Sequence, residues 1–351
     1  MSYLLQLVII LLLTKLGAHL SNIFNFPSVI GELLVGVLAG PAVLNLLAPN
    51  TFTHYFAELG VIVLMFIAGL EGDLKALLHY WKPSLTVAIL GVIVPTASAF
   101  LLCYYVFGFS AKTAIFLGLI LSATSVSITV QVLREMQRLN SPEGSMILGA
   151  AVADDIICVI LLGICVSLFG TTATSPRSIS LMLGLMLLFF VLALSLGKWF
   201  VPKFLAVFSR LNASENETTA ALVLCFGFAF LAVSLGMSDV LGAYFAGLAI
   251  SETNFKERLA LKIEPIGYAV FIPVFFVSIG LNISFVGMSK DILFITCLII
   301  IAILGKQIGC GLGARCFGLS TNAANIVGAG MVSRGEMALV VTNVALSTHL
   351  I

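Results

Sequence analysis

Charged side chains are scarce in this sequence. Asp, Glu, Lys and Arg make up 9% of its 351 residues, whereas an average soluble protein has about 25%. Hydrophobic residues make up 60%, so the chain lacks the polar side chains that would cover the surface of a soluble domain of this size. The composition therefore excludes an ordinary soluble protein.

An excess of charge of either sign is also missing. Lys and Arg number 17 and Asp and Glu 16, which gives a formal net charge of +1, so we expect no nucleic-acid partner. The seven cysteines form no C-x-x-C pair, and we interpret them as buried apolar side chains. The N-terminus lacks the basic region and cleavage site of a signal peptide, so we expect its first apolar segment to be retained.

Long apolar segments recur along the whole chain, each near the ~20 residues that a helix needs to cross a bilayer. The predicted helices cover residues 3–20, 27–47, 55–70, 83–107, 113–134, 145–169, 178–200, 218–236, 239–251, 264–284, 291–316 and 322–348. The sequence therefore predicts an all-α polytopic membrane protein with about twelve transmembrane helices. Most basic loop residues lie in one set of alternate loops, and only Lys112, Arg177 and Lys290 lie in the other, which predicts an N-terminus outside the cell.

Two pairs of similar segments recur at one constant offset. The segment VIG at residues 29–31 resembles VLG at 240–242, and 242 − 31 = 211. The segment that ends in Gly69–Leu70 resembles the one that ends in Gly280–Leu281, and 280 − 69 = 211. This offset shifts the pattern by seven helices, an odd number, so the copies have opposite membrane orientations. Inverted repeats are typical of secondary transporters, with the substrate site at the midplane.

The repeat predicts the organisation of the chain. Residues 1–170 form the first six-helix repeat, 171–216 a linker helix and cytoplasmic loop, and 217–351 the inverted second repeat. The second copy lacks its sixth helix, because 155 + 211 = 366 lies beyond Ile351. A complete copy needs roughly 30 more residues.

Charged residues inside the apolar segments mark the candidate site. Asp154 and Asp155 stand near the centre of their segment, where each carboxylate costs about 2.5–3.5 kcal/mol unless it has a partner or a task. Neighbouring helical residues diverge by about 100°, so we expect one aspartate to face the transport path and the other a fixed charge. Lys306, also within a span, is the obvious fixed charge.

Two apolar segments carry helix-breaking sequences. Residues 122–127 are small and hydroxyl-rich, and residues 328–330 and 333–335, with three glycines and one serine, interrupt the last segment; 124 + 211 = 335 makes the two breaks equivalent. Broken helices at membrane depth point to a binding site. Arg334 and Glu336 can pair across one turn, and Glu71 ends the third span. Without a sixth helix in the second copy, we expect the unwound segment 328–335 to face lipid or a void. It then re-forms as continuous helix, is covered by a neighbouring subunit, or leaves the chain inactive and easily degraded. We therefore expect low transport by residues 1–351, restored by roughly 30 further residues with a spanning helix.

Five motifs follow one another along the chain: LSATS at 121–125, Asp154–Asp155, FFVSIGL at 275–281, Gly305–Lys306 and MVSRGE at 331–336. Together they resemble the cation:proton antiporter-2 family, and within it the bacterial NapA-type Na+/H+ antiporters. The resemblance implies thirteen helices, an inverted repeat with two crossing broken helices, and a homodimer with a mobile core domain in the bacterial inner membrane. It also implies that Asp155 carries the ion or proton, that Asp154 pairs with Lys306, and that exchange is electrogenic. The nucleotide-binding domain of Kef-type relatives is absent from the sequence.

The predicted function is therefore a secondary antiporter that exchanges cytoplasmic Na+ or Li+ for external H+. It is not an enzyme, and its partners are the lipid bilayer and the transported ions, with no further cofactor. Oxygen atoms of Asp155, Asp154, Thr124 and Ser125 and of the broken backbone suit a monovalent cation; Lys306, Arg334, Glu336 and Glu71 are supporting residues. A K+/H+ antiporter, an ion channel and a transport-inactive fragment remain alternatives. An intramembrane aspartyl protease would need a G-x-G-D motif, which the sequence lacks.

Overall fold

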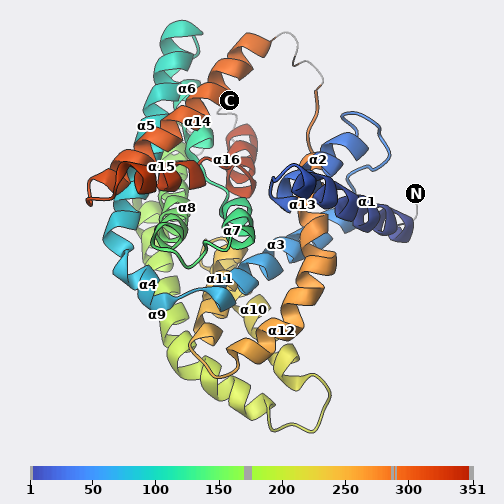
Figure 1. The fold of residues 1–351 in the computed structure, drawn as a ribbon. Helices are drawn as coiled ribbons and strands as arrows, with labels where there is room; N and C mark the ends of the chain where they lie inside the picture. Colours follow the sequence, from blue (N-terminus) through green and yellow to red (C-terminus); the bar gives the residue numbers. More distant parts are fainter. Residues whose placement is uncertain (1–2, 170–175, 286–287, 289–290, 348–351) are drawn as a thin grey trace. The chain divides into compact units, whose positions relative to one another are not determined.

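The computed structural model describes residues 3–169, 176–285, 288 and 291–347, and all regular secondary structure in these ranges is helical (Figure 1). The helices are α1 (Tyr3–Ile23), α2 (Ser28–Ala39), α3 (Thr51–Glu71), α4 (Leu74–His79), α5 (Trp81–Leu101), η1 (Leu102–Val106), α6 (Ala111–Ser122), α7 (Val126–Glu135), α8 (Pro142–Phe169), α9 (Pro176–Phe208), α10 (Asn216–Ser234), α11 (Asp239–Ser251), α12 (Lys256–Ile266), η2 (Gly267–Phe271), α13 (Ile272–Leu281), α14 (Ile292–Arg315), α15 (Thr321–Gly330) and α16 (Glu336–Ser347). The π-helices η1 and η2 continue α5 and α12. Lys290 and the side chain of Arg177, which entered the orientation argument, lie outside the described part.

Nine helical segments of the described chain are long and apolar enough to cross a bilayer. The remaining predicted segments correspond to the shorter apolar helices α2 and α11 and to the broken pair α15–α16. The structure therefore confirms an all-α polytopic membrane protein with about twelve spans.

The chain forms two compact units, each assembled from distant parts of the sequence. Unit 1 comprises residues 1–74, 134–136 and 185–285, and unit 2 comprises residues 75–133, 137–184 and 286–351. The chain thus leaves unit 2 for only three residues, Arg134 to Met136, before it returns.

Glycine residues hold the helices of unit 1 close together. α3 packs against α11, and α2 packs against α13. A Cβ atom on Gly69 would lie 2.1 Å from a backbone oxygen of α11, and one on Gly36 would lie 2.2 Å from a backbone oxygen of α13. Gly247 and Gly280 face them from the other side of these crossings, and small residues there let the backbones approach. Because 36 and 69 plus 211 give 247 and 280, the two crossings are equivalent in the two copies of the repeat.

The contact between α1 and α2 recurs between α10 and α11 at the same offset. A Cβ atom on Gly31 would lie 2.1 Å from the carbonyl oxygen of Gly17, and one on Gly242 would lie 2.3 Å from that of Phe228. Both positions of the second pair follow from the first by adding 211. These repeated contacts accord with the inverted-repeat fold. The boundaries at 170 and 217 stay a prediction, because each compact unit combines parts of both halves.

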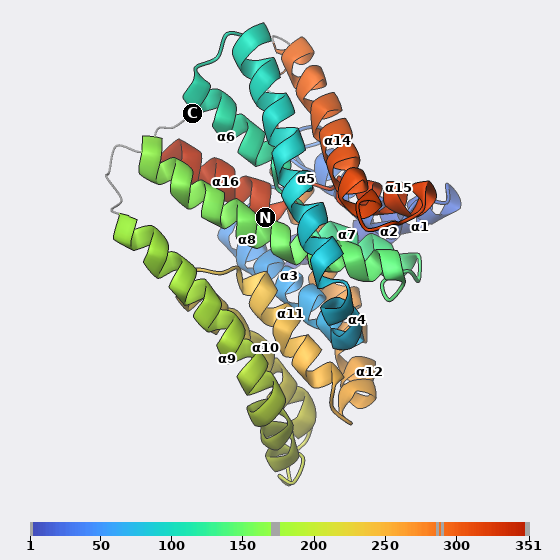
Figure 2. The ribbon, with the colours of Figure 1, turned by 90° about the vertical axis from the view of Figure 1, so that its left-hand side faces the viewer.

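In unit 2, α14 lies along α5 (Figure 2), and a stripe of glycines on α14 faces α5. Gly305, Gly309 and Gly313 are spaced four residues apart and therefore lie on one face of α14. A Cβ atom on Gly309 would lie 2.5 Å from the carbonyl oxygen of Leu90 on α5. This close approach fixes the position of Lys306, which directly follows Gly305 in the sequence.

Candidate ion-binding site

The two aspartates lie in the middle of α8, a helix of 28 residues in unit 2. Asp154 is completely buried, and Asp155 is 7% exposed. Successive helical residues point about 100° apart, so the two carboxylates do not face the same neighbours. The site therefore holds two adjacent carboxylates with different surroundings.

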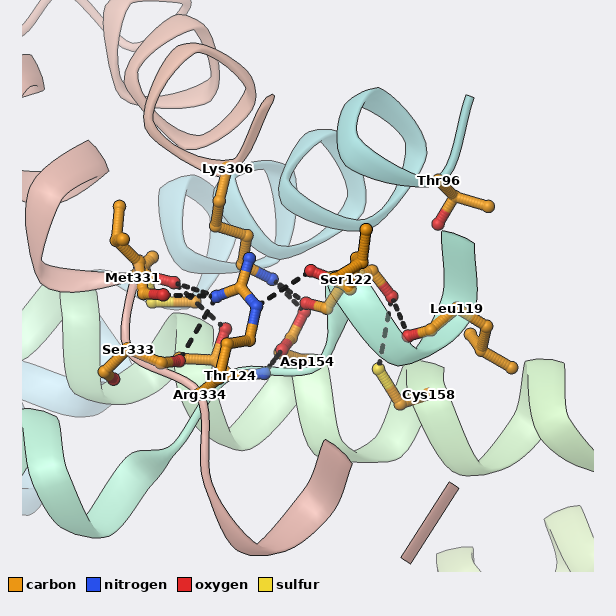
Figure 3. A network of polar contacts seen from close by, with 12 residues as sticks. Thr96, Leu119, Ser122, Thr124, Asp154, Cys158, Lys306, Met331, Ser333 and Arg334 are labelled. Atoms are coloured by element: carbon orange, nitrogen blue, oxygen red, sulfur yellow. Dashed lines mark hydrogen bonds and ion pairs between the residues drawn. The ribbon is translucent and has the colours of Figure 1, made fainter. Parts of the chain in front are cut away.

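Asp154 is held by an ammonium group and a backbone amide (Figure 3). The Nζ atom of Lys306 lies 2.8 Å from Oδ1 of Asp154, and both side chains are completely buried. The amide of Thr124 donates to Oδ2 of Asp154 at 2.9 Å, and Nζ of Lys306 also donates to the carbonyl oxygen of Ser122 at 2.5 Å. Charge-assisted bonds of this kind are what a buried ion pair needs to offset its desolvation. The pairing agrees with the one that the resemblance implied, whereas the transport roles of both residues remain predictions.

Both predicted breaks exist, and they cross each other inside unit 2. The chain is non-helical between α6 and α7 and between α15 and α16. The amide of Ser125 donates to the carbonyl oxygen of Ser333 at 2.9 Å, and the Ser333 hydroxyl donates back to the carbonyl oxygen of Ser125 at 3.0 Å. The hydroxyl of Thr124 donates to the carbonyl oxygen of Met331 at 3.3 Å. Each break thus supplies hydrogen-bond partners to the unwound backbone of the other.

This crossing corrects the expectation for the segment 328–335. That segment does not re-form as continuous helix, and its unwound backbone meets the first break of the same chain. The expectation of a continuous helix was therefore wrong, whereas cover by a second subunit and low transport stay predictions. The helices that flank the second break also pack on α6 and α8.

Arg334 binds backbone carbonyl groups on three sides (Figure 3). Its Nε donates to Leu121 at the end of α6 at 2.8 Å, and one terminal nitrogen donates to Ala302 of α14 at 3.1 Å. The other terminal nitrogen donates to Val332 at 2.5 Å and reaches Met331 and Ser333 at 3.3 and 3.2 Å. A cation at the carbonyl end of a helix is favourable for the helix dipole. The side chain of Glu336, the partner considered for Arg334, lies outside the described residues.

Hydroxyl groups line the crossing. The Thr129 hydroxyl lies 2.7 Å from that of Ser333 and donates to the carbonyl oxygen of Gly330 at 2.8 Å. The hydroxyls of Ser125 and Ser127 are 3.2 Å apart, and both residues are completely buried. Of these residues, the sequence reasoning missed Thr129, although its place one helical turn after Ser125 was a signal that could have found it.

Glu71 belongs to a different charged cluster, which lies in unit 1. Its carboxylate accepts from Nε of Arg134 at 2.8 and 2.9 Å, and a terminal nitrogen of Arg134 lies 2.6 Å from Glu264. The guanidinium also stacks 4.0 Å from the centre of the Tyr268 ring. Both ion-paired carboxylates are about one-quarter exposed, so Glu71, at the end of its span, is partly exposed and has an ion-pair partner. The sequence did not single out Glu264 or Tyr268.

The comparisons with known proteins agree with this architecture. The sequence model of the family described as "Sodium/hydrogen exchanger, transmembrane" matches residues 8–351. The chain belongs to the sodium/hydrogen exchanger family. It is 45% identical to a protein named Na(+)/H(+) antiporter from Enterococcus hirae, over 98% of this chain and 90% of that one. It is also 44% identical to the Na(+)/H(+)-K(+) antiporter GerN from Bacillus cereus, over 99% of this chain and 88% of that one.

The fold of this exchanger family member is similar to that of a solved antiporter structure. The electron-microscopy structure of the sodium proton antiporter MjNhaP1 from Methanocaldococcus jannaschii superimposes with a TM-score of 0.69. The match covers 100% of this chain and 97% of MjNhaP1 at 14% sequence identity. At this identity the likeness concerns the fold alone.

The cluster is suited to binding one small cation or one proton. With both aspartates ionised and Lys306 protonated, the three side chains carry a net charge of −1. One bound cation or one proton neutralises these three side chains, while the guanidinium of Arg334, which binds carbonyl oxygens at the same crossing, adds a positive charge nearby.

Proposed function

We propose that this exchanger family member is a secondary antiporter that moves cytoplasmic Na+ or Li+ against external H+. Asp155 is the carboxylate that both ions use in turn. The observation that carries the proposal is the fully buried Lys306–Asp154 pair directly beside Asp155. Because the ammonium and the Thr124 amide hold Asp154, its charge is already balanced, and the neighbouring carboxylate determines whether the cluster is charged or neutral.

Exchange follows from the competition of two ligands for one carboxylate. A proton and a cation cannot neutralise the same oxygen atoms together, so binding of one favours release of the other. Hydroxyl and carbonyl oxygens of the crossing, including those of Thr124 and Ser125, supply the further ligands that a hard cation needs. The half-saturating Na+ concentration is then expected to rise as the pH falls.

Several finer expectations belong to this proposal. They are an inner-membrane location in a bacterium, an external N-terminus that follows from the basic loops, a homodimer and electrogenic exchange. K+/H+ exchange is the second candidate, and the name of the relative from Bacillus cereus, which mentions K+ as well as Na+, favours it.

The test is ion-driven proton movement in proteoliposomes that contain the purified protein and an internal pH-sensitive dye. External Na+ or Li+ is expected to move protons out of the vesicles, and equal K+ less so. Movement with K+ alone would favour the second candidate. No response to any of these ions, by protein shown to be folded and inserted, would contradict antiport.

A further inference from the structure

Unit 1 contains a buried carboxylate that the exchange mechanism does not use. Glu32 lies in the second turn of the apolar helix α2 and is 7% exposed. No hydrogen bond or ion pair to it occurs among the residues that the structure describes. The sequence reasoning passed over Glu32, although a carboxylate within a predicted span is the same signal that singled out Asp154.

The charged groups around Glu32 come from two neighbouring parts of unit 1. Lys15 of α1 and Glu135 are the charges that act on it, while His19 of α1 is exposed. The ammonium of Lys15 donates to the carbonyl oxygen of Tyr268 at 3.1 Å and makes no ion pair with Glu32 within 4.0 Å. The other helix packed on α2, α13, carries no charged side chain.

Glu135 is already engaged at the beginning of α2. Its carboxylate accepts from the backbone amide of Ser28 at 2.6 Å and from the Ser28 hydroxyl. An anion at a helix N-terminus is favourable for the helix dipole, and the Glu135 carboxylate lies at the beginning of α2. Glu32 follows Ser28 by one helical turn and therefore lies close to this negative charge.

An ionised Glu32 would be a buried charge without a partner. Such a group costs several kcal/mol in a protein interior, so it must acquire a proton or a cation. A metal ion of the hard type needs several oxygen ligands, and the neighbouring carboxylate of Glu135 already binds Ser28 with both oxygen atoms. One unpartnered carboxyl group is sufficient for a proton.

We propose that Glu32, in unit 1, is a proton-binding carboxylate of this protein in addition to Asp155 in unit 2. The ligand is the proton itself. Unit 1 thereby has a protonation state of its own, and the protein binds one proton more than the exchange at Asp155 requires.

The proposal is tested by chemical labelling of the unmodified protein in detergent without Na+. Dicyclohexylcarbodiimide, an apolar reagent, reacts with protonated carboxyl groups in apolar surroundings, and peptide mass spectrometry locates the label. We expect labelling of Glu32 at neutral pH that disappears as the pH rises, and no labelling of Glu135. An unlabelled Glu32 at every pH, with Asp155 labelled in the same sample, would overturn the proposal.

Infrared spectroscopy provides the matched test with variants. The band is read without Na+ in the Asp155→Asn background, where Asp155 cannot contribute. The carbonyl band of a neutral carboxylic acid is expected in Asp155→Asn and in Asp155→Asn/Glu135→Gln, and its loss is expected in Asp155→Asn/Glu32→Gln. A band that persists unchanged in folded Asp155→Asn/Glu32→Gln would overturn the assignment. Neither measurement depends on transport, so a failure of the proposed antiport would leave the result for Glu32 intact.

Discussion

Lys306 is a residue whose position needs an explanation, because an ammonium group is costly at membrane depth. Its stem passes the surface of α5 at Gly91, where a Cβ atom would lie 3.5 Å from Nζ. The Lys306 ammonium donates hydrogen bonds to Asp154 and to the carbonyl oxygen of Ser122, the last residue of α6. Helix ends of this kind carry a partial negative charge, so lysine is stabilised by two acceptors at once.

We predict that Lys306→Ala lowers the melting temperature strongly. Removing one partner of a buried pair strands the other charge and costs about 3–5 kcal/mol. Asp154→Asn is expected to restore part of this stability, because the double variant no longer buries an unpaired carboxylate. Thermal unfolding of the two single variants and the double variant in detergent measures the coupling, and strictly additive losses would contradict the pair.

The exposed pair between Lys262 and Glu215 provides the control for this measurement. The two side chains are 2.8 Å apart, and the hydrogen bond from Lys262 lowers the pKa of the Glu215 carboxyl group. Exposed pairs contribute little to stability because water and salt screen them. Lys262→Ala is therefore expected to melt close to the wild type, and an equal drop for Lys262→Ala and Lys306→Ala would contradict the role given to burial.

At the scale of elements, one guanidinium group joins three elements around the crossing of the two broken helices. Arg334 satisfies carbonyl groups that α6 and the second break leave without helical partners, and it also binds α14. Unsatisfied carbonyl groups are costly at membrane depth. Because the planar guanidinium presents donors in several directions, one side chain can hold three elements.

We predict that Arg334→Lys does not replace this function. Lysine keeps the charge, but its compact ammonium cannot reach Leu121, Ala302 and Val332 together. Hydrogen bonds to a charged group are worth about 1.5–3 kcal/mol each, so the variant is expected to melt lower and to exchange ions more slowly. Wild-type melting and wild-type flux of Arg334→Lys would show that charge alone is sufficient.

The close helix crossings of unit 1 lead to a further prediction. Gly69→Ala places a methyl group against a backbone oxygen and is expected to cost about 1–3 kcal/mol, as overpacking does. Gly227 on α10 is the control, because a Cβ atom there has no neighbour within 4 Å. Gly227→Ala is expected to melt at or above the wild-type temperature. Equal melting temperatures for the two variants would contradict the claim that the crossing at Gly69 excludes a side chain.

The sequence carries the signals that are local along the chain. Apolar length predicts the spans, small and hydroxyl residues predict both breaks, and a charge within an apolar segment identifies Asp154 and Lys306. The sequence could not predict the partners of Arg334, because these are backbone groups that come together only where the breaks cross. The cluster of Glu71, Arg134 and Glu264 likewise joins residues far apart in sequence.

At the scale of the whole molecule, the constant offset of 211 residues connects sequence and packing. Glycine contacts in unit 1 recur at this offset, and the two breaks of unit 2 meet at Ser125 and Ser333, where 333 − 125 = 208 is within three residues of it. Each unit is therefore built from both halves of the chain. The charged cluster of Asp154, Asp155 and Lys306 lies within unit 2.

The most direct test of the central claim is Na+-driven proton flux in proteoliposomes that contain Asp155→Asn. This variant keeps the Lys306–Asp154 pair, so it is expected to insert and to melt near the wild-type temperature. Cation-coupled proton flux is expected to be absent, whereas Asp291→Asn, at an exposed aspartate without a side-chain cap to α14, keeps the wild-type rate. Wild-type exchange by a folded and inserted Asp155→Asn protein would contradict the assignment of Asp155 as the carboxylate that sodium and protons share.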